Sequence, residues 1–479
     1  MPIDAVWMAV AVALPALGAL IAPLSTIDLA YQVRTGDEII AVRAIPAVDA
    51  FTFSAAGLPW TVQQWGAAVA LAVGFAPAGW TGLLVLRALL VGATFALMLA
   101  ACRLRGASAR TAALLTLAAF VVAIGALGLR AQLFGVLCFA AVLALTGARH
   151  RMPRLYLLTP VILLAWANMH GSFPLGLLAI GWALLEDLAR DRRAWTRDGI
   201  ILAASAAATC LTPYGPGVWA YAAGLVRTPA VAGLVSEWQP VTLRSVEGLA
   251  LAVSAAFVAC AVALRGRRPL WPLLAWLAAL LLLALWAERW VVWWGIGSMV
   301  AVAGVLAAAP AGSSAPATDS TAPARRPSVA NGVLALAILL APVVVAVGLL
   351  ARPSDPVAGP PGLLSDAPAG VTRAVRSLAG PGTRILNAQR WGSWLEWAVP
   401  GAPVFVDSRF EVVPEDAWRD YVALSDGRFD WRERLARIDP DLIVTPRAEL
   451  SGLLDAIEAD PAAGWRTVYA DDDGVVLAR

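Results

Sequence analysis

The stretch WTGLLVLRALLVGATFALMLAACRLRGASAR (80–110) combines a long apolar run with a connection that carries three arginines. A helix of about 20 apolar residues spans the hydrocarbon core of a membrane. Similar runs recur through the 479 residues, of which 60% are hydrophobic. Only 14% of the residues are charged, whereas an average soluble domain has about 25%. The sequence therefore predicts a multi-span α-helical membrane protein.

About eleven apolar runs are interpreted as transmembrane helices. They cover residues 4–22, 80–101, 109–128, 132–148, 155–168, 173–189, 199–212, 247–264, 270–287, 290–309 and 330–351. Every second connection is rich in arginine, and the last of these is the Ser/Pro/Ala-rich linker 310–328. Because arginine-rich connections stay in the cytoplasm, we expect a cytoplasmic N-terminus, a cytoplasmic linker and an extracytoplasmic C-terminus.

The segment TVQQWGAAVALAVGFA (61–76) is also apolar, but it does not fit as a span. Counting it as one would move every later arginine-rich connection to the other side of the membrane. We therefore interpret it as a helix at the outer membrane surface, with Gln63, Gln64 and Trp65 at the headgroups.

Two long parts of the chain are expected outside the membrane. The first is the loop 23–79 after the first span, and the second is the polar region 353–479. In the second part we expect strands at 384–387, 404–407, 442–445, 466–470 and 474–478, and helices near 415–424, 430–437 and 449–458. The predicted domains are thus a transmembrane domain, 1–352, and an extracytoplasmic α/β domain, 353–479.

Polar residues near the predicted spans gather at their outer ends. Such residues are costly in a membrane and are candidates for function. They are Asp28, Arg130, Gln132, Asn168, His170, Tyr214, Glu237, Glu288 and Arg289. Chemistry is therefore expected at the outer face.

Arg130 and Arg289 depart from the positive-inside pattern and have two interpretations. A guanidinium near the headgroups can bind a phosphate through paired hydrogen bonds. Alternatively, these side chains extend to the membrane surface, or Arg289 pairs with Glu288.

Asn168 and His170 lie in WANMHGSF (166–173), where two short spans meet. A neutral imidazole there could bind a sugar or phosphate, or transfer a proton. Alternatively, it satisfies backbone groups at a tight turn. His150, among arginines in a cytoplasmic connection, is expected to be solvated only.

Asp28 directly follows the first span. A carboxylate at that boundary can deprotonate an acceptor hydroxyl or bind a divalent cation. Asp49, in the same loop, either belongs to the pocket or caps a turn. Binding of a divalent cation stays open but is not indicated, because no second acidic residue has a fitting spacing.

Other function classes lack support. The net charge of +3 is too small to indicate a nucleic-acid partner. The four cysteines have neither metal-site spacing nor the pattern of a disulfide framework. There is no phosphate-binding glycine loop, no GxSxG and no HExxH.

Several short motifs, taken in order, resemble a known family. They are IDLAYQVRTGDEI (27–39), LPWTVQQW (58–65), GLRAQLF (128–134), WANMHGSF (166–173), LTPYGPGV (211–218), SEWQP (236–240), ERW (288–290), WGSWLEW (391–397) and VFVDSRFE (404–411). Together they resemble bacterial polytopic proteins of the GT-C superfamily of glycosyltransferases. That superfamily includes protein O-mannosyltransferases and the catalytic subunit of oligosaccharyltransferase. The resemblance extends over nearly the whole chain.

The resemblance implies an inverting glycosyltransferase in the plasma membrane of a bacterium. It would move a sugar from a polyprenyl-phosphate donor to an acceptor hydroxyl on the outer face. Asp28 matches the position of the catalytic aspartate and would be the base, and Arg130 and Arg289 would contact the donor phosphate. The remaining pocket residues would be Gln132, Asn168, His170, Tyr214, Glu237 and Asp49. The acceptor side, similar to a tryptophan-rich acceptor motif, would include Trp391, Trp394, Asp407 and Arg409.

One departure from the family pattern keeps a second interpretation open. Thr26 and Gln32 stand where relatives tend to have an acidic residue and a histidine. The alternative is a non-catalytic protein of the same fold that binds, flips or assembles envelope lipids or glycans.

Overall fold

The computed structural model describes residues 1–190, 193, 195–225, 236–264, 271–307, 328–355, 357 and 359–479. These residues form two compact units. The helical unit contains the described residues of Met1–Ala22 and Leu84–Ala351, and the mixed unit contains Pro23–Leu83 and those of Arg352–Arg479. The predicted arginine-rich connection at 265–268 and the linker 310–328, up to residue 327, lie outside the described residues.

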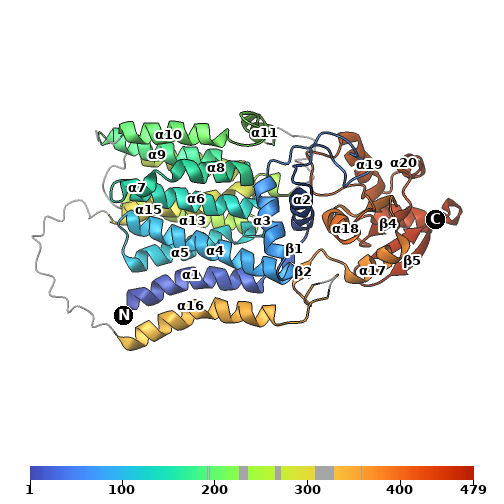
Figure 1. Cartoon of the computed structure of the whole chain (residues 1–479), viewed down its shortest axis with the longest axis horizontal. Helices are drawn as coiled ribbons and strands as arrows, with labels where there is room; N and C mark the ends of the chain where they lie inside the picture. The colour runs from blue at the N-terminus through green and yellow to red at the C-terminus, as the bar shows by residue number, and fades with distance from the viewer. Residues whose placement is uncertain are drawn as a thin grey trace, which may run out of the picture. The chain divides into compact units, whose positions relative to one another are not determined.

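Eleven helices cover the eleven apolar runs of the sequence (Figure 1). They are α1 (Ile3–Ile21), α4 (Gly79–Leu104), α5 (Ala109–Ala123), α6 (Ala131–Ala148), α8 (Thr159–Met169), α9 (Pro174–Ala189), α10 (Trp195–Thr209), α13 (Val246–Leu264), α14 (Trp271–Trp286), α15 (Val291–Ala307) and α16 (Val329–Leu350). Short elements complete the unit: α7 (Pro153–Tyr156), α11 (Gly217–Leu225), η1 (Ile124–Ala126), η2 (Ser236–Trp238) and η3 (Glu288–Trp290).

Seven helical segments among the described residues are long and apolar enough to cross a membrane. They are α1, α4, α5 with η1, α6, α13, η3 with α15, and α16. The helices α8, α9, α10 and α14 have 11 to 16 residues and are shorter than a usual span. The chain is thus a multi-span membrane protein, while the number of eleven spans stays a prediction.

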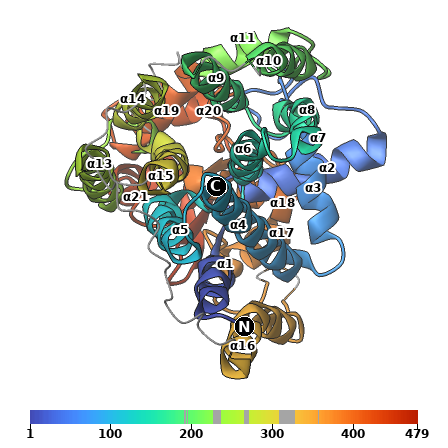
Figure 2. The ribbon, with the colours of Figure 1, turned by 90° about the vertical axis from the view of Figure 1, so that its left-hand side faces the viewer.

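Figure 2 shows the helices of this unit nearly end-on, with α16 at the margin beside α1. Most of the α16 surface is apolar and uncovered by protein, as suits a helix that faces lipid. The centre of the unit is aromatic: Trp182 stacks on Trp276 at 4.7 Å, and Trp166 stacks on Trp293 at 6.0 Å. Large flat rings fill the space between helices whose backbones cannot approach closely.

One end of this unit carries a buried ion-pair network. Arg149, just after α6, contacts Glu186 at 3.0 Å and Asp187 at 3.2 Å. Arg105 donates to both oxygens of Glu186, at 2.8 and 2.9 Å. His150 Nε2 lies 3.1 Å from Asp187, so the prediction that His150 is solvated only is wrong. The carboxylates of α9 reach across to the arginines, a contact between distant helices that local sequence does not reveal.

Arg130 lies at the opposite end of α6 from this network. It is the N-cap residue, and Arg149 is the C-cap residue of the 18-residue helix. At 1.5 Å per residue the two ends are about 27 Å apart, close to the thickness of a bilayer core. The helical unit therefore has polar groups at both ends and an apolar, aromatic middle.

The mixed unit begins with β1 (Leu24–Ser25), α2 (Leu29–Val42) and α3 (Trp65–Phe75). With 11 residues, α3 is about 16 Å long, roughly half a bilayer core. This length agrees with the interpretation of segment 61–76 as a helix that does not span. The C-terminal part adds β2 (Leu364–Ser365), α17 (Ala369–Leu378), β3 (Ile385–Asn387), η4 (Gln389–Trp391), α18 (Gly392–Ala398), α19 (Glu415–Ser425), α20 (Trp431–Ile438), β4 (Leu442–Thr445), α21 (Ser451–Glu458), η5 (Pro461–Ala463), β5 (Arg466–Ala470) and β6 (Val475–Ala478).

Four of the strands form one sheet in the order β3-β4-β6-β5. The pair β3 and β4 is parallel, and β6 runs antiparallel to both β4 and β5. The turn between β5 and β6 is closed by Asp471, whose Oδ1 accepts from the N–H groups of Asp473 and Gly474.

The strand predicted at 404–407 is wrong beyond its first residue. Val404 forms isolated parallel bridges with Ile385 and with Thr52 of the first loop. The N–H of Phe405 still donates to the carbonyl of Ile385 in β3 at 2.8 Å. At Val406 the side-chain amide of Asn387 takes the place of a neighbouring strand. Its Oδ1 accepts from the N–H of Val406 at 3.3 Å, and its Nδ2 donates to the carbonyl of Val406 at 2.7 Å.

The first loop belongs to a different unit in the structure from the domain in which the sequence analysis places it. Residues 23–83 pack with the C-terminal region in one unit rather than with the helical unit. In that unit β1 pairs with β2 in parallel, and Trp80 meets Trp394 and Trp397 at 5.6 and 4.8 Å. Two parts of the chain some 300 residues apart therefore share one core.

Candidate functional site

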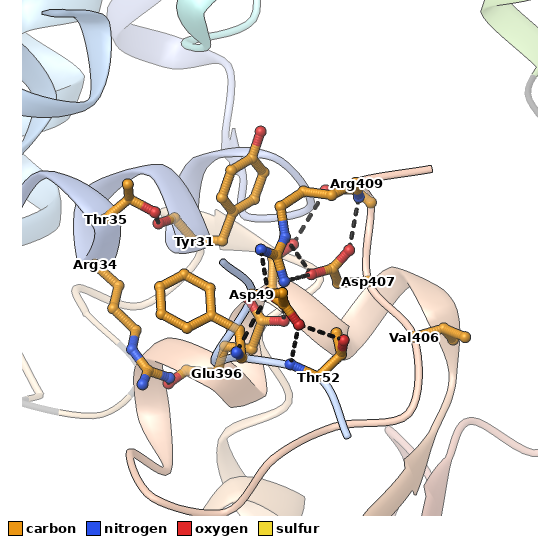
Figure 3. Close-up of polar contacts among 12 residues, drawn as sticks. Tyr31, Arg34, Thr35, Asp49, Thr52, Glu396, Val406, Asp407 and Arg409 are labelled. Atoms are coloured by element: carbon orange, nitrogen blue, oxygen red, sulfur yellow. Dashed lines mark hydrogen bonds and ion pairs between the residues drawn. The ribbon is translucent and has the colours of Figure 1, made fainter. Parts of the chain in front are cut away.

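Four ionisable side chains meet in the interior of the mixed unit (Figure 3). Arg409 donates from Nε to Asp407 and from Nη1 to Asp49, both at 2.6 Å. Its Nη2 lies 3.5 Å from Glu396. All four side chains are fully buried. We call these residues the Arg409 cluster.

The Arg409 cluster joins three separate segments. Asp49 belongs to the first loop, where its Oδ2 accepts from the N–H and hydroxyl of Thr52 at 3.0 and 2.6 Å. Glu396 lies on α18. Asp407 also accepts from the N–H of Arg409 at 2.7 Å, which fixes the chain after the Val404 bridge. A buried charge is tolerated only with such partners, so the cluster fixes these segments to one another.

Three aromatic rings enclose the guanidinium of Arg409. Its Cζ lies 4.4 Å from the ring centre of Trp60, 4.9 Å from Phe51 and 5.6 Å from Tyr31. A cation over an aromatic face is attracted by the ring, more strongly when both are shielded from water. The rings therefore stabilise the charge that the carboxylates neutralise.

The acidic members of the Arg409 cluster are crowded together. Burial raises the pKa of Glu396 well above its usual value, and the nearby charge of Asp407 raises it further. The protonated form of Glu396 is therefore favoured by its surroundings, because each additional buried charge is costly.

Asp28, Tyr31 and Glu411 lie close to one another beside the Arg409 cluster. Asp28 is the N-cap residue of α2, and Tyr31 follows it by three positions on the same face. Burial raises the pKa of Tyr31, and the charges of Asp28 and Glu411 raise it further. The phenol therefore stays protonated at neutral pH and can donate a hydrogen bond.

The side chain of Glu411 is exposed to solvent, and nearby protein atoms displace part of its hydration. The loss of hydration raises its pKa to about 7, against the opposing effects of a backbone hydrogen bond and of Arg409. Asp407 and Asp28 add to the increase. A carboxyl with this pKa exchanges protons readily at neutral pH. Sequence reasoning missed Glu411, because a single glutamate at the end of VFVDSRFE carries no signal of its own.

The acidic groups of the Arg409 cluster do not fit a metal ion. Within the described part of the chain, no three His, Cys, Asp or Glu side chains are arranged to hold one. Asp49, Glu396 and Asp407 do converge, but the guanidinium of Arg409 occupies the point on which they converge.

The residues predicted for the acceptor side are interior residues. Trp391 and Trp394 are buried, as are Asp407 and Arg409. The indole N–H of Trp394 donates to Thr372 at 2.8 Å. These side chains hold the mixed unit together and do not form an open surface. A tryptophan-rich segment looks the same in sequence whether its rings form a core or bind a ligand.

The helical unit brings together the two predicted phosphate contacts. Arg130 pairs with Glu237 at 2.7 Å, and Arg289 lies over the ring of Trp238 at 4.1 Å. Burial alone would raise the pKa of Glu237, but the charges of Arg130 and Arg289 hold it below the usual value. Both arginines therefore lie near one carboxylate, as a shared phosphate site requires.

His170 lies in the turn between α8 and α9. Its Nδ1 accepts from the N–H of Ser172 at 3.2 Å and lies 2.6 Å from the Ser172 hydroxyl. Through Nδ1, His170 therefore satisfies a backbone group of a tight turn, as the second interpretation of this residue expects. The tautomer that this contact selects carries its proton on Nε2. The turn fits closely against α6, where Gly135 leaves room for Ser172 and Trp166.

The other predicted pocket residues of the helical unit are Asn168, Gln132 and Tyr214, and their contacts differ. Asn168 donates to the carbonyls of Leu164 and Leu211, at 2.9 and 3.1 Å, and so supports the backbone. Gln132 is buried on the first turn of α6, and no described group bonds its Oε1. Tyr214 lies in a turn where its N–H donates to the hydroxyl of Thr212 at 3.3 Å.

The predicted site residues thus form two groups. One group belongs to the helical unit and the other to the mixed unit. Arg130, Glu237, His170 and Arg289 meet in the helical unit. Asp28 and Asp49 belong to the mixed unit, with Asp407 and Arg409. Tyr31, Glu396 and Glu411 were missed, because tertiary contacts alone give them significance.

Two solved structures share the fold of the chain. One is the archaeal oligosaccharyltransferase AglB from Archaeoglobus fulgidus in complex with an inhibitory peptide and a dolichol-phosphate. It has a TM-score of 0.59 and 12% identity, over 98% of this chain and 74% of that chain. The other is the Archaeoglobus fulgidus oligosaccharyltransferase tethered to an acceptor peptide with the NVT sequon. It has a TM-score of 0.59 and 13% identity, over 94% of this chain and 72% of that chain.

No protein-family model and no curated protein sequence matches the chain. The likeness to the two structures covers both the helices and the C-terminal region. The chain therefore shares the fold of this archaeal oligosaccharyltransferase over most of its length.

Proposed function

We propose that the protein is a membrane glycosyltransferase. It moves a sugar from a polyprenyl-phosphate donor to an acceptor hydroxyl, with inversion, on the outer face of a bacterial plasma membrane. The observation that carries this proposal is the GT-C-type fold along nearly the whole chain, with Asp28 at the start of the first loop. A fold alone does not fix a function, so the proposal also draws on the side chains of each unit.

In the mixed unit, Asp28 is the proposed base. The acceptor oxygen forms a bond to the anomeric carbon while the bond from that carbon to the phosphate oxygen breaks. The acceptor's proton goes to Asp28, and the electron pair of the broken bond stays on the phosphate. A single in-line displacement of this kind inverts the anomeric carbon. Positioned proton transfer contributes about 10²–10⁴-fold to such a step.

In the helical unit, Arg130 and Arg289 are the proposed contacts of the donor phosphate. Charge develops on the phosphate as the sugar leaves, and fixed cations stabilise that charge. Glu237 would hold Arg130 in place, and Trp238 would hold Arg289. His170 Nε2 and the buried Gln132 would add neutral hydrogen bonds. The archaeal structure in complex with a dolichol-phosphate supports a lipid-linked donor of this class.

The test is cleavage of a radiolabelled polyprenyl-phosphate sugar by the full-length protein in proteoliposomes. Hexosyl and pentosyl donors are offered in turn, and release of polyprenyl phosphate is measured. Asp28→Asn should slow release by about 100-fold or more. The matched control is Asp37→Asn, an exposed carboxylate on the same helix α2, which should leave release unchanged. Donor binding or movement across the bilayer without cleavage would instead support the non-catalytic alternative.

The phosphate contact has its own test. Arg289→Gln should raise the KM for the donor by about tenfold or more, because a hydrogen bond to a charged group contributes about 1.5–3 kcal/mol. Arg244→Gln, on an exposed arginine of the described 236–264 segment, serves as the control. An unchanged KM in the Arg289 variant would remove this residue from the donor site.

A further inference from the structure

We propose that Glu411 is a second catalytic carboxyl, which together with Asp28 forms the base that takes the acceptor's proton. This inference rests on the proposed function and extends its active site to the C-terminal region. Two segments of the mixed unit that run side by side support it.

The segments 27–31 and 408–411 are in direct contact. The hydroxyl of Ser408 donates to the carbonyl of Ile27 at 2.9 Å. One position after Ser408 and four positions after Ile27, the guanidinium of Arg409 lies 5.6 Å from the ring of Tyr31. These contacts bring Asp28 and Glu411 near enough to Tyr31 for both charges to act on its phenol.

Arg409 precedes Glu411 by two positions but does not form an ion pair with it. Its donors are committed to Asp407, Asp49 and Glu396. Figure 3 shows the guanidinium directed at these acidic groups, with the Tyr31 hydroxyl pointing away from them. The carbonyl of Arg409 accepts from the N–H of Val412 at 2.9 Å. Arg409 therefore positions the turn that carries Glu411.

The surroundings give Glu411 the properties of a base. The charged groups that act on it are Arg409 and Asp407 of its own segment and Asp28 of the α2 segment. A nearby negative charge makes the Glu411 carboxylate bind a proton more tightly. Uptake of the acceptor's proton removes the repulsion between the carboxylates of Asp28 and Glu411.

The chemistry balances without another reactant. The acceptor oxygen bonds to the anomeric carbon, the bond to phosphate breaks, and the phosphate keeps the electron pair. The single proton released by the acceptor hydroxyl is held by the carboxylates of Asp28 and Glu411. The Tyr31 phenol, on which both charges act, keeps its own proton.

The experiment is the pH–rate profile of donor cleavage by the full-length protein, in wild type, Glu411→Gln and Glu411→Asp. Glu411→Gln should lower kcat by about 100-fold with little change in the donor KM. Glu411→Asp should recover at least part of the rate. The wild-type rate should fall as pH drops below about 7, the pKa of Glu411, and this limb should move to lower pH in Glu411→Gln. The thermal midpoint of each variant shows that it is folded.

Glu415→Gln is the matched control, four residues away, exposed and paired with Arg419 at 3.8 Å. It should have the wild-type profile. If Glu411→Gln cleaves donor at the wild-type rate with an unmoved acidic limb while Asp28→Asn is inactive, this inference is overturned and the proposed function stands. If wild type itself cleaves no donor, both are overturned.

Discussion

At the scale of single residues, the mixed unit depends on how its charges are neutralised. Arg409 is fully buried and bonded to acidic side chains of three segments, whereas Arg419 on α19 is mostly exposed and pairs with Glu415 at 3.8 Å. A buried ion pair is costly to break, because the partner left behind is an uncompensated charge. An exposed pair contributes little. The two arginines should therefore respond very differently to the same substitution.

Arg409→Met is expected to destabilise the protein by about 3–5 kcal/mol, the usual cost of removing one partner from a buried pair. Arg419→Met should change stability by less than about 1 kcal/mol. The measurement is the thermal midpoint of the purified protein in detergent. Equal midpoints for the two variants would contradict the role assigned to the Arg409 cluster.

A second residue-scale prediction concerns pH and Glu411. Its pKa of about 7 in the folded protein lies above the usual glutamate value of about 4.3. Folding therefore favours the protonated form of Glu411. The contribution of this group to the free energy of unfolding is fully present below about pH 4 and is lost as the pH rises towards 7. The thermal midpoint of wild type should thus fall more between pH 5 and pH 8 than that of Glu411→Gln. Identical slopes in the two proteins would show that Glu411 has an ordinary pKa.

At the scale of elements, the position of α2 depends on a close approach to α3. A Cβ added at Gly36 would lie 2.1 Å from the carbonyl oxygen of Ala68, so only glycine lets the two helices meet. On its other side, α2 is tied to α18 by Arg34, whose Nη1 donates to the carbonyl of Glu396 at 2.7 Å. Because Asp28 and Tyr31 are on the first turn of α2, the packing of this helix sets their positions.

Gly36→Ala is expected to cost about 1–3 kcal/mol, because overpacking forces a backbone shift. The control is Gly181→Ala on α9, where an added Cβ meets nothing within 4 Å. There the loss of backbone freedom in the unfolded chain should make alanine neutral or stabilising by about 0.5–1 kcal/mol. Thermal midpoints of both variants give the comparison, and a Gly36→Ala protein as stable as wild type would show that α2 and α3 can separate without cost.

At the scale of the whole molecule, the mixed unit is discontinuous in sequence. One of its hydrophobic clusters contains Phe51, Ala55, Trp60, Val62 and Val412, and only Val412 comes from the C-terminal region. Asp49, a partner of Arg409, also comes from the first loop. A boundary drawn at residue 352 therefore divides a core and a charge network.

The fragment 353–479 is accordingly expected not to fold cooperatively by itself. It lacks four of the five cluster residues and one carboxylate partner of a buried arginine. Near-ultraviolet circular dichroism during heating, together with limited proteolysis, should show a broad transition and rapid digestion. A sharp transition with a protease-resistant fragment would mean that the C-terminal region is an independent domain after all.

Local sequence patterns predicted the membrane class, the positions of the helices and all four strands of the sheet. The patterns are apolar runs of nearly constant length, arginine in alternate connections, and short β-branched segments next to turns. The strand predicted at 404–407 does not continue, because the amide of Asn387, nearly 20 residues away, bonds both backbone groups of Val406. The apolar pattern carries no information about that contact.

Which polar residues act together depends on the tertiary structure. Asp49 could equally have been a turn cap or a pocket residue, and it is both a cap for Thr52 and a partner of Arg409. Glu396 and Glu411 look like ordinary surface glutamates in the sequence, yet the surroundings raise the pKa of both, and that of Glu411 to about 7. The physical reason is that a pKa or an ion pair depends on distance through space, and these partners are separated by up to about 360 residues of chain.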